Sequence, residues 1–347
     1  MSKYKTTGKQ TLFDAENAAQ KLSEIGNPLE KLESVIDFEM FRSRFEDAMV
    51  NHNTKSKAGA KQCDEVMMVK VMVLRQCYNL GYEQTECQII GSSSFKQFLG
   101  LASGDKVPDA NTIRNFFEGL RGIGMVAKLF QDFVDELLEN GFIFNEGQRV
   151  DASFVLEPRQ RNTRDESREV GGGGGGDFFG YKVSKERRKD IAASCARHIK
   201  DDFFWYKVSG KVDGESKFFK KIVVTTASPN ASTMFPGLMA ESGRGQVTFA
   251  ARAYVRKEET PQKYGLKGEI CEKGYRGKPL TDEQKEENRK KSVIRSRVEH
   301  VFGFMEGAMH GLTVRTIGIA RATAHIYLKS LTYNMFRYEQ FVRNGIR

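Results

Sequence analysis

The sequence lacks any apolar run long enough to span a bilayer, which takes about 18 to 20 residues. Its first segment, MSKYKTTGKQ, carries charges without a following apolar stretch, so we expect no secretion signal. The five cysteines are odd in number and never spaced as CxxC, which argues against a disulfide framework and a zinc site. The five histidines form no close pair with metal-ligand spacing. The sequence therefore predicts a cytoplasmic protein with reduced thiols and no membrane partner.

Basic residues outnumber acidic ones. Lys and Arg total 55 against 45 Asp and Glu, which gives a formal net charge of +10 and a sequence pI near 9.2. This excess favours a polyanionic partner, although charge alone does not separate a nucleic-acid binder from a protein with an ordinary basic surface. The 347 residues suit two domains, each with a core of its own.

The first part of the chain is polar at its start and then helical in pattern. Residues 1–27 are polar, and we expect a flexible N-terminus. From residue 28 to residue 141, apolar residues recur at helical spacing, as in PLEKLESVIDFEMF and DEVMMVKVMVL. Asp109 is a predicted N-cap, and the helix after it exposes Arg114. Such short helices are typical of a helix-turn-helix-like DNA-binding module, but short helix pairs also occur in proteins that never contact DNA.

The pattern changes from helix to strand at Gly141. The segment GFIFNEGQRVDASFVL has two runs rich in Val, Ile and Phe around a turn, which predicts a β-hairpin or two successive strands. Asp151 lies in the second run, between Val150 and Ala152. A carboxylate inside a buried strand is costly unless something compensates its charge, and a metal ion is one such compensator. The alternative is an aspartate on the exposed face of an edge strand.

Residues 157–200 are charged and irregular and include six consecutive glycines. Because that many glycines disfavour a helix or strand interior, we expect a basic, Gly-rich loop. Arg159 and Arg161 at its start suit phosphate contacts, and they suit a solvated tether equally well. Beyond the loop, two strand patterns joined by DGES predict a hairpin. The run QVTFAARAYV then predicts a further strand before an irregular insert at residues 255–287.

The segment from Asn288 to Met305 combines basic residues, an apolar stripe and one carboxylate. Its apolar residues recur every three to four positions, so this predicted helix should pack on a core. Glu299 lies beside the apolar face, one turn after Arg295. Such a helix can hold a metal ion close to a phosphate backbone; the alternative is an ordinary amphipathic helix with a solvated ion pair. A final helix over residues 320–343 and a tail at residues 339–347 complete the chain.

Several segments carry a resemblance to a known family. GYRGKPLTDEQKEENRKKSVIRSRVEHVFGFM, VRTIGIARATAHIYLKSLTYNMFRY and VDASFVLEPRQRN resemble the catalytic part of DDE transposases of bacterial insertion sequences. VIDFEMF, SSSFKQFLGL and VPDANTIRNF resemble the amino-terminal module of the same proteins. The chain is most similar to insertion-sequence family five, within the family four/five superfamily. The resemblance covers most of residues 28–338.

The resemblance implies an α+β or α/β chain. An N-terminal all-α module would precede an RNase H-like catalytic domain over residues 142–338, with a mixed central sheet flanked by helices. In the family, three carboxylates hold two divalent ions, Mg²⁺ or Mn²⁺, which activate a water or a DNA 3′-hydroxyl and stabilise the leaving oxygen. Asp151 matches the first aspartate and Glu299 the closing glutamate, so both are expected metal ligands. Arg295 matches an arginine of the same motif that is expected to contact phosphate.

The resemblance also implies a partner. We expect double-stranded DNA, both the terminal inverted repeats of the element and target DNA, bound by a homodimer associated with the bacterial nucleoid. The expected DNA contacts come from basic residues of the helical module, the Gly-rich loop and the Glu299 helix: Arg114, Arg159, Arg161, Arg289, Lys290, Lys291, Arg295 and Arg297.

One catalytic carboxylate is missing. The family's strand with the second aspartate reads aromatic, Ala, Asp, basic, and Ala251 stands at the aspartate position here. A methyl group cannot coordinate magnesium, so Asp151 and Glu299 should bind metal weakly and in the wrong geometry. Further departures from the family pattern are Ala192, Cys195, Trp205, Ser209, Ala231 and Glu306. Two hypotheses follow: an insertion-sequence transposase with impaired chemistry, engineered or decayed, and a non-catalytic DNA-binding protein or regulator derived from a transposase.

Overall fold

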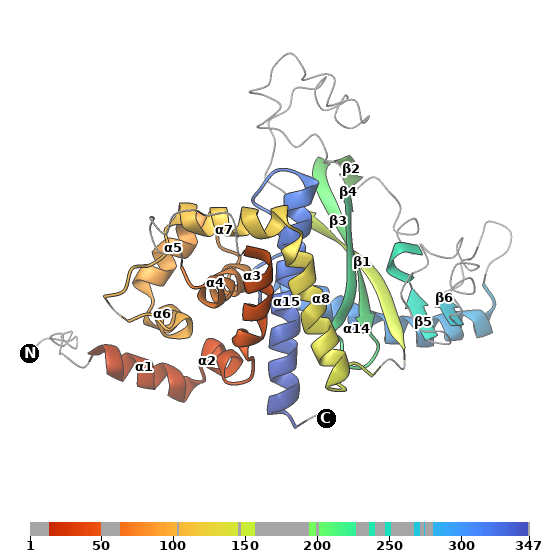
Figure 1. Cartoon of the computed structure of the whole chain (residues 1–347). Helices are drawn as coiled ribbons and strands as arrows, with labels where there is room; N and C mark the ends of the chain where they lie inside the picture. The colour runs from red at the N-terminus through yellow and green to blue at the C-terminus, as the bar shows by residue number, and fades with distance from the viewer. Residues whose placement is uncertain are drawn as a thin grey trace, which may run out of the picture.

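The structure is a computed structural model of the chain. It describes residues 14–49, 63–102, 104–144, 147–156, 194–198, 201–226, 236–239, 247–250, 267–270, 274 and 280–345. Figure 1 shows helices on one side, a sheet on the other, and one long helix between them.

The amino-terminal part is helical throughout its described residues, as predicted. Its elements are α1 (Asp14–Ile25), α2 (Pro28–Glu33), η1 (Phe38–Phe41), α3 (Arg42–Met49), α4 (Glu65–Cys77), α5 (Tyr82–Gly91), α6 (Ser93–Leu99), α7 (Ala110–Gly122) and α8 (Met125–Glu139). Polar side chains start several of these helices by accepting a first-turn backbone N–H, which has no partner inside the helix. Asp109 confirms its predicted role, since its Oδ1 accepts the N–H of Thr112 at 2.7 Å.

The second part contains a mixed sheet. Its strands are β1 (Gln148–Leu156), β2 (Ser194–His198), β3 (Asp201–Asp213), β4 (Phe219–Thr226), β5 (Val247–Ala250) and β6 (Lys267–Ile270). β3 pairs antiparallel with β1, β2 and β4, whereas β5 lies parallel to β1 and β6 lies parallel to β5. The predicted fold class, a helical module followed by an RNase H-like domain with a mixed sheet, is confirmed.

The predicted hairpin at DGES is β3 and β4. Gly210 of β3 lies where a side chain would not fit, because a Cβ added there would meet the Phe219 ring at 2.4 Å. Phe219 is fully buried, and its ring packs edge-on against Phe302 and Tyr333. The sheet therefore presents a tightly packed aromatic surface to the two carboxy-terminal helices.

The helix that carries position 299 is α14 (Asp282–Glu306). Thr281 caps its first turn, and Gln284 returns a hydrogen bond to the Thr281 backbone N–H, so both sides of the capping box are present. Val301 and Met305 are buried, as the apolar stripe predicted. The helix packs against β1 and β5.

The last helix, α15 (Ile319–Arg343), joins the two parts of the molecule. It contacts α4, α7 and α8 of the helical part and β3 and β4 of the sheet, and Figure 1 shows it between them. Asn334 pairs with the β4 backbone: Phe219 N–H donates to its Oδ1 at 2.9 Å, and its Nδ2 donates to Phe219 O at 3.0 Å. One continuous hydrophobic core results, so the two parts form a single packed body.

Several element boundaries differ from the expected ones. Helix α1 lies inside the segment expected to be a flexible N-terminus, and β2 lies inside the expected loop at residues 157–200. Strand β6 and the first turn of α14 lie inside the expected insert at residues 255–287, because Thr281 starts the helix at Asp282. Helix α15 ends at Arg343, as the helical pattern over residues 320–343 predicted, and it therefore overlaps the expected tail at residues 339–347, where Phe341 is buried.

The first run of the segment at Gly141 does not form a strand. β1 already has β3 on one side and β5 on the other, which leaves no edge for another partner. Ile143 instead enters the core, and the Phe142 ring packs edge-on against Tyr338 at 4.8 Å between centroids.

Among the described residues, no helix has the length and apolar character that a membrane span requires.

Candidate active site

Asp151 lies in the middle of β1, at the centre of the sheet. It is half-buried, and its Oδ1 accepts the backbone N–H of Ala152 at 2.9 Å. Its direct neighbour on β3 is Gly210. The strand is therefore central, and the alternative of an aspartate on an edge strand is excluded.

The side chain of Asp151 belongs to the face of the sheet that α14 covers. The side chains of directly paired residues on antiparallel strands point to the same face of a sheet. Asp151 pairs with Gly210, so its side chain points to the face on which a Cβ of Gly210 would lie. That Cβ would meet the Phe219 ring, and the same ring packs against Phe302 of α14.

A second contact supports this placement. Ser153 lies two residues after Asp151, and residues two apart on a strand share a face. The Ser153 hydroxyl donates to Glu306 Oε1 of α14 at 3.5 Å. Asp151 and the carboxy-terminal half of α14 are thus on the same side of the sheet.

The other two predicted catalytic positions are only partly described. Glu299 lies within α14, but its side chain is outside the described part of the structure, as are those of Arg295 and Arg297. Ala251 lies outside the described residues, directly after β5. The last described pair of the parallel strands is Val150 with Ala250.

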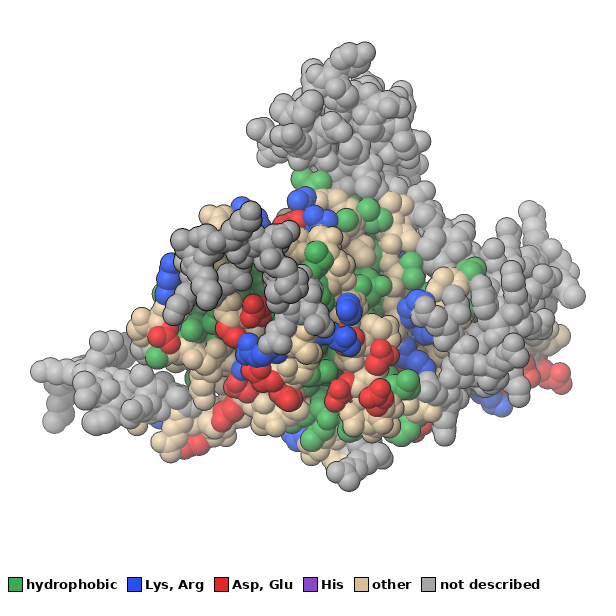
Figure 2. All heavy atoms as spheres, viewed as in Figure 1, with side chains coloured by type: hydrophobic (Ala, Val, Ile, Leu, Met, Phe, Trp, Pro, Cys, Tyr) green, Lys and Arg blue, Asp and Glu red, His purple; other side chains and the backbone are tan. Residues whose placement is uncertain are grey.

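The predicted DNA-contacting residues fall into separate groups. Arg114 is exposed on α7, with its guanidinium carbon 5.5 Å from the centre of the Tyr82 ring. Arg289 and Lys290 are exposed on α14, and Arg289 lies 3.8 Å from Glu286. Lys291 is half-buried beside them, while Arg159 and Arg161 lie outside the described residues. On the face shown in Figure 2, Lys and Arg lie among Asp and Glu side chains.

No metal centre is visible among the side chains that the structure describes. In that part of the chain, no three His, Cys, Asp or Glu residues are grouped closely enough to hold an ion. Of the three positions that carry catalytic carboxylates in the family, residue 251 and the side chain of residue 299 lie outside the described part of the chain.

A buried polar network connects α4 with α15. The Gln76 amide lies 3.1 Å from His325 Nδ1, and the His325 ring stacks on Phe117 with centroids 4.4 Å apart. Burial, and then the nearby cations Arg75 and Lys329, lower the pKa of His325 well below its usual value. His325 is therefore neutral in the folded protein at physiological pH.

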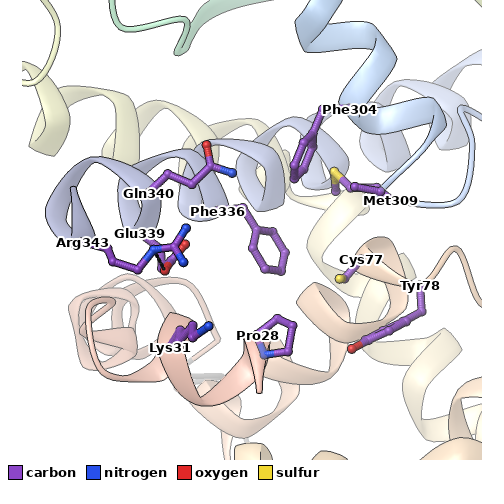
Figure 3. Close-up of a pocket in the computed structure, with 11 residues that line it drawn as sticks. Pro28, Lys31, Cys77, Tyr78, Phe304, Met309, Phe336, Glu339, Gln340 and Arg343 are labelled. Atoms are coloured by element: carbon purple, nitrogen blue, oxygen red, sulfur yellow. Dashed lines mark ion pairs between the residues drawn. The ribbon is translucent and has the colours of Figure 1, made fainter. Parts of the chain in front are cut away.

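A cavity of about 310 Å³ lies between α2, the end of α4, the end of α14 and α15. Figure 3 shows Phe336 pointing into it from α15, with Cys77 among the lining residues on the opposite side. Burial raises the pKa of the Cys77 thiol to about 12, so this cysteine is an inert core residue rather than a nucleophile. The cavity lies at the junction of the helical part with α15, and Asp151 is not among its lining residues.

The sequence pattern did not identify the contact between β1 and α14 on the Asp151 face of the sheet. Ser153 is an ordinary strand residue in the sequence, and its contact with Glu306 joins positions 153 residues apart. The left-handed backbone of Asn79 and His310, at φ +49° and +57°, likewise had no sequence signal.

Comparison with known proteins assigns the chain to a family. Residues 16–119 match the model described as Transposase domain (DUF772), and residues 150–335 match the one described as Transposase DDE domain. The chain is 26% identical over 147 residues to the transposase for insertion sequence element IS1106 of Neisseria meningitidis serogroup B, which covers 41% of this chain and 51% of that relative. The chain thus spans about half the length of this curated relative. No solved structure gives a significant match. Because the DDE domain covers more than half of its residues, the chain belongs to the DDE transposase family.

Proposed function

We propose that this protein binds the DNA ends of its insertion sequence, and that its cleavage and strand-transfer chemistry is impaired because residue 251 carries no carboxylate. The observation that carries the proposal is the position of Asp151 on the sheet face covered by α14. This is the arrangement that the family's two-metal chemistry requires of its first aspartate and closing glutamate.

Helical geometry supports the role of Glu299. It precedes Glu306 by seven residues, about two helical turns, so the two Cα atoms lie on the same side of α14. Glu306 is the residue that reaches Ser153 on the Asp151 face. A glutamate two turns earlier on that side is a suitable partner for Asp151.

The donor set does not fit the family's complete metal site. Mg²⁺ and Mn²⁺ prefer carboxylate oxygens, and the family uses three carboxylates for two ions. Asp151 and Glu299 supply two, whereas Ala251, which follows the last described pair of β1 and β5, supplies none. Two carboxylates do not complete the two-metal site that DNA cleavage in this family requires. Asp151 and Glu299 would therefore bind a metal ion only weakly.

The missing carboxylate also favours a second function. A transposase-derived regulator would keep the fold and the DNA-binding surface and would need no metal chemistry. Under both functions the partner is double-stranded DNA, and terminal inverted repeats, a homodimer on DNA and nucleoid association remain our predictions.

Restoring the carboxylate separates the two functions. We expect Ala251→Asp to nick DNA that carries the element's ends when Mg²⁺ or Mn²⁺ is present, and an added Glu299→Gln to abolish nicking. Ala127, exposed on α8, provides the matched control Ala127→Asp, which should remain inactive. End binding without any nicking by Ala251→Asp would favour the regulator. Metal-dependent cleavage by the unaltered protein would refute the role given to position 251.

The placement of DNA along α14 is tested by salt dependence. We expect Arg295→Ala and Arg297→Ala to weaken DNA binding, because each phosphate that an arginine neutralises releases counterions. Each substitution should also lower the slope of log K against log salt by about 0.9 for every phosphate that is no longer neutralised. Arg343→Ala, at the exposed end of α15, is the matched control. Unchanged affinity and slope in both α14 variants would place the DNA elsewhere.

A further inference from the structure

A polar groove of about 480 Å³ lies between the turn after α4 and the loop that joins α14 to α15. Its volume is within the range of roughly 300 to 1,000 Å³ that is typical of small-ligand sites. The lining combines aromatic rings, side-chain amides and one arginine, with no carboxylate: Tyr78, Asn79, Leu80, Gln84, Gln88, Phe95, His310 and Arg315. This composition suits a ligand that has a flat ring, hydrogen-bonding edges and a negative charge.

The backbone around the groove is strained. Asn79 and His310 have φ of +49° and +57°, and they are two of the three residues other than glycine with positive φ in the described part of the chain. Two hydrogen bonds fix these residues. Asn79 Nδ2 donates to His310 O at 2.8 Å, and Arg315 Nη2 donates to Asn79 O at 3.1 Å. Left-handed residues maintained by specific hydrogen bonds are concentrated at functional sites, because the surrounding structure must offset their strain.

The aromatic side chains form a platform. The Tyr78 and His310 rings stack with centroids 6.0 Å apart and an angle of 22° between planes, and Phe95 supports Tyr78 at 5.0 Å. His310 is exposed, so its ring is accessible from solvent. Gln84 and Gln88 are four residues apart on α5 and therefore lie on one face of that helix. Gln84 Oε1 already accepts the Gly81 N–H at 2.9 Å, which leaves the NH2 group of Gln84 to donate.

We propose that this groove binds an unpaired nucleotide of the DNA on which the protein acts. The base stacks on the Tyr78 and His310 platform, its edge hydrogen-bonds to the glutamine amides, and Arg315 contacts the adjacent phosphate. The inference rests on the proposed function, because it takes DNA as the substrate. The proposed site lies where the helical part contacts the loop after α14. It binds a nucleotide that is not part of a duplex.

The test compares a short blunt duplex with the same duplex carrying a single-stranded 3′ overhang that contains 2-aminopurine. Affinity is measured by fluorescence anisotropy, and stacking is measured by quenching of 2-aminopurine. We expect the overhang to tighten binding about tenfold, equivalent to about 1.4 kcal/mol. Binding of the blunt duplex reports on the proposed function, whereas the gain from the overhang reports on the groove, so the two can fail separately.

Two variants and a control locate the gain. His310→Asn removes the ring, and asparagine tolerates the left-handed backbone that alanine would strain. Gln88→Glu places a negative charge in the groove, and Gln97→Glu makes the same change on the exposed surface of α6. We expect the first two variants to abolish both the tighter binding and the quenching, and the control to keep both.

Equal binding of blunt and overhanging DNA would overturn the proposal, and so would a gain that survives both groove variants. Free dAMP identifies the source of the nucleotide. If dAMP displaces the overhang at a concentration comparable to that of the overhanging DNA, the groove binds a nucleotide that need not belong to a DNA strand. If dAMP does not displace it, the groove takes its nucleotide from the DNA strand.

Discussion

Replacing Asn334 with leucine tests the junction between α15 and the sheet. The side chain of Asn334 is fully buried, and it bonds both backbone groups of Phe219, which is itself fully buried. Leucine has a similar size but can neither donate nor accept. The Phe219 N–H and C=O would have no hydrogen-bond partner in a place where water cannot replace one.

The cost can be worked out from those two groups. A buried polar group without a partner costs about 1 to 3 kcal/mol, so two of them predict a loss of about 2 to 6 kcal/mol. This is a large part of the roughly 5 to 15 kcal/mol that stabilises a typical folded protein. We therefore expect Asn334→Leu to be one of the most destabilising single changes in α15.

The measurement is the free energy of unfolding in urea, followed by far-UV circular dichroism. Asn344→Leu, an exposed position just after the same helix, is the matched control and should change stability by less than about 0.5 kcal/mol. A loss below about 0.5 kcal/mol for Asn334→Leu would refute the view that this side chain joins α15 to β4.

Three further outcomes are expected. Gly210→Ala should destabilise the protein by about 1 to 3 kcal/mol in the same assay, because the new Cβ would overlap the Phe219 ring; an unchanged midpoint would contradict this packing. Below about pH 6.5 His325 should bind a proton in the unfolded chain but not in the folded protein. The free energy of unfolding should therefore decrease as the pH is lowered, by at most about 1.4 kcal/mol per pH unit. His325→Gln should flatten that slope, and an equal slope in both proteins would rule His325 out as its source. Mass-spectrometric mapping of thiol labelling should show exposed Cys87 reacting quickly and buried Cys77 reacting only on unfolding, whereas fast labelling of Cys77 in the folded protein would contradict its burial.

The features that could be predicted from the sequence depend on neighbouring residues. The cap at Asp109, the hairpin at DGES and the buried face of Val301 and Met305 all follow from local turn chemistry or helical spacing. Asp151 could be assigned to a strand for the same reason, whereas its proposed role as a metal ligand comes from the family resemblance alone.

The features that could not be predicted depend on contacts between distant segments. Asn334 and Phe219 are 115 positions apart, and a buried asparagine has no distinctive neighbours in the sequence. The run that contains Ile143 has a strand-like composition, yet both edges of β1 are occupied by β3 and β5, so it packs as an irregular segment. The groove at His310 requires a left-handed backbone that a histidine in the sequence does not indicate.

We propose that Asp151 and Glu299 share a metal-binding face that position 251 leaves incomplete. Mn²⁺ binding tests this proposal, measured by electron paramagnetic resonance on the unaltered protein, on Ala251→Asp, and on Ala251→Asp combined with Asp151→Asn. We predict that Ala251→Asp binds Mn²⁺ at least about tenfold more tightly than the unaltered protein, and that adding Asp151→Asn removes the gain. Equal Mn²⁺ affinity in all three proteins would contradict the claim.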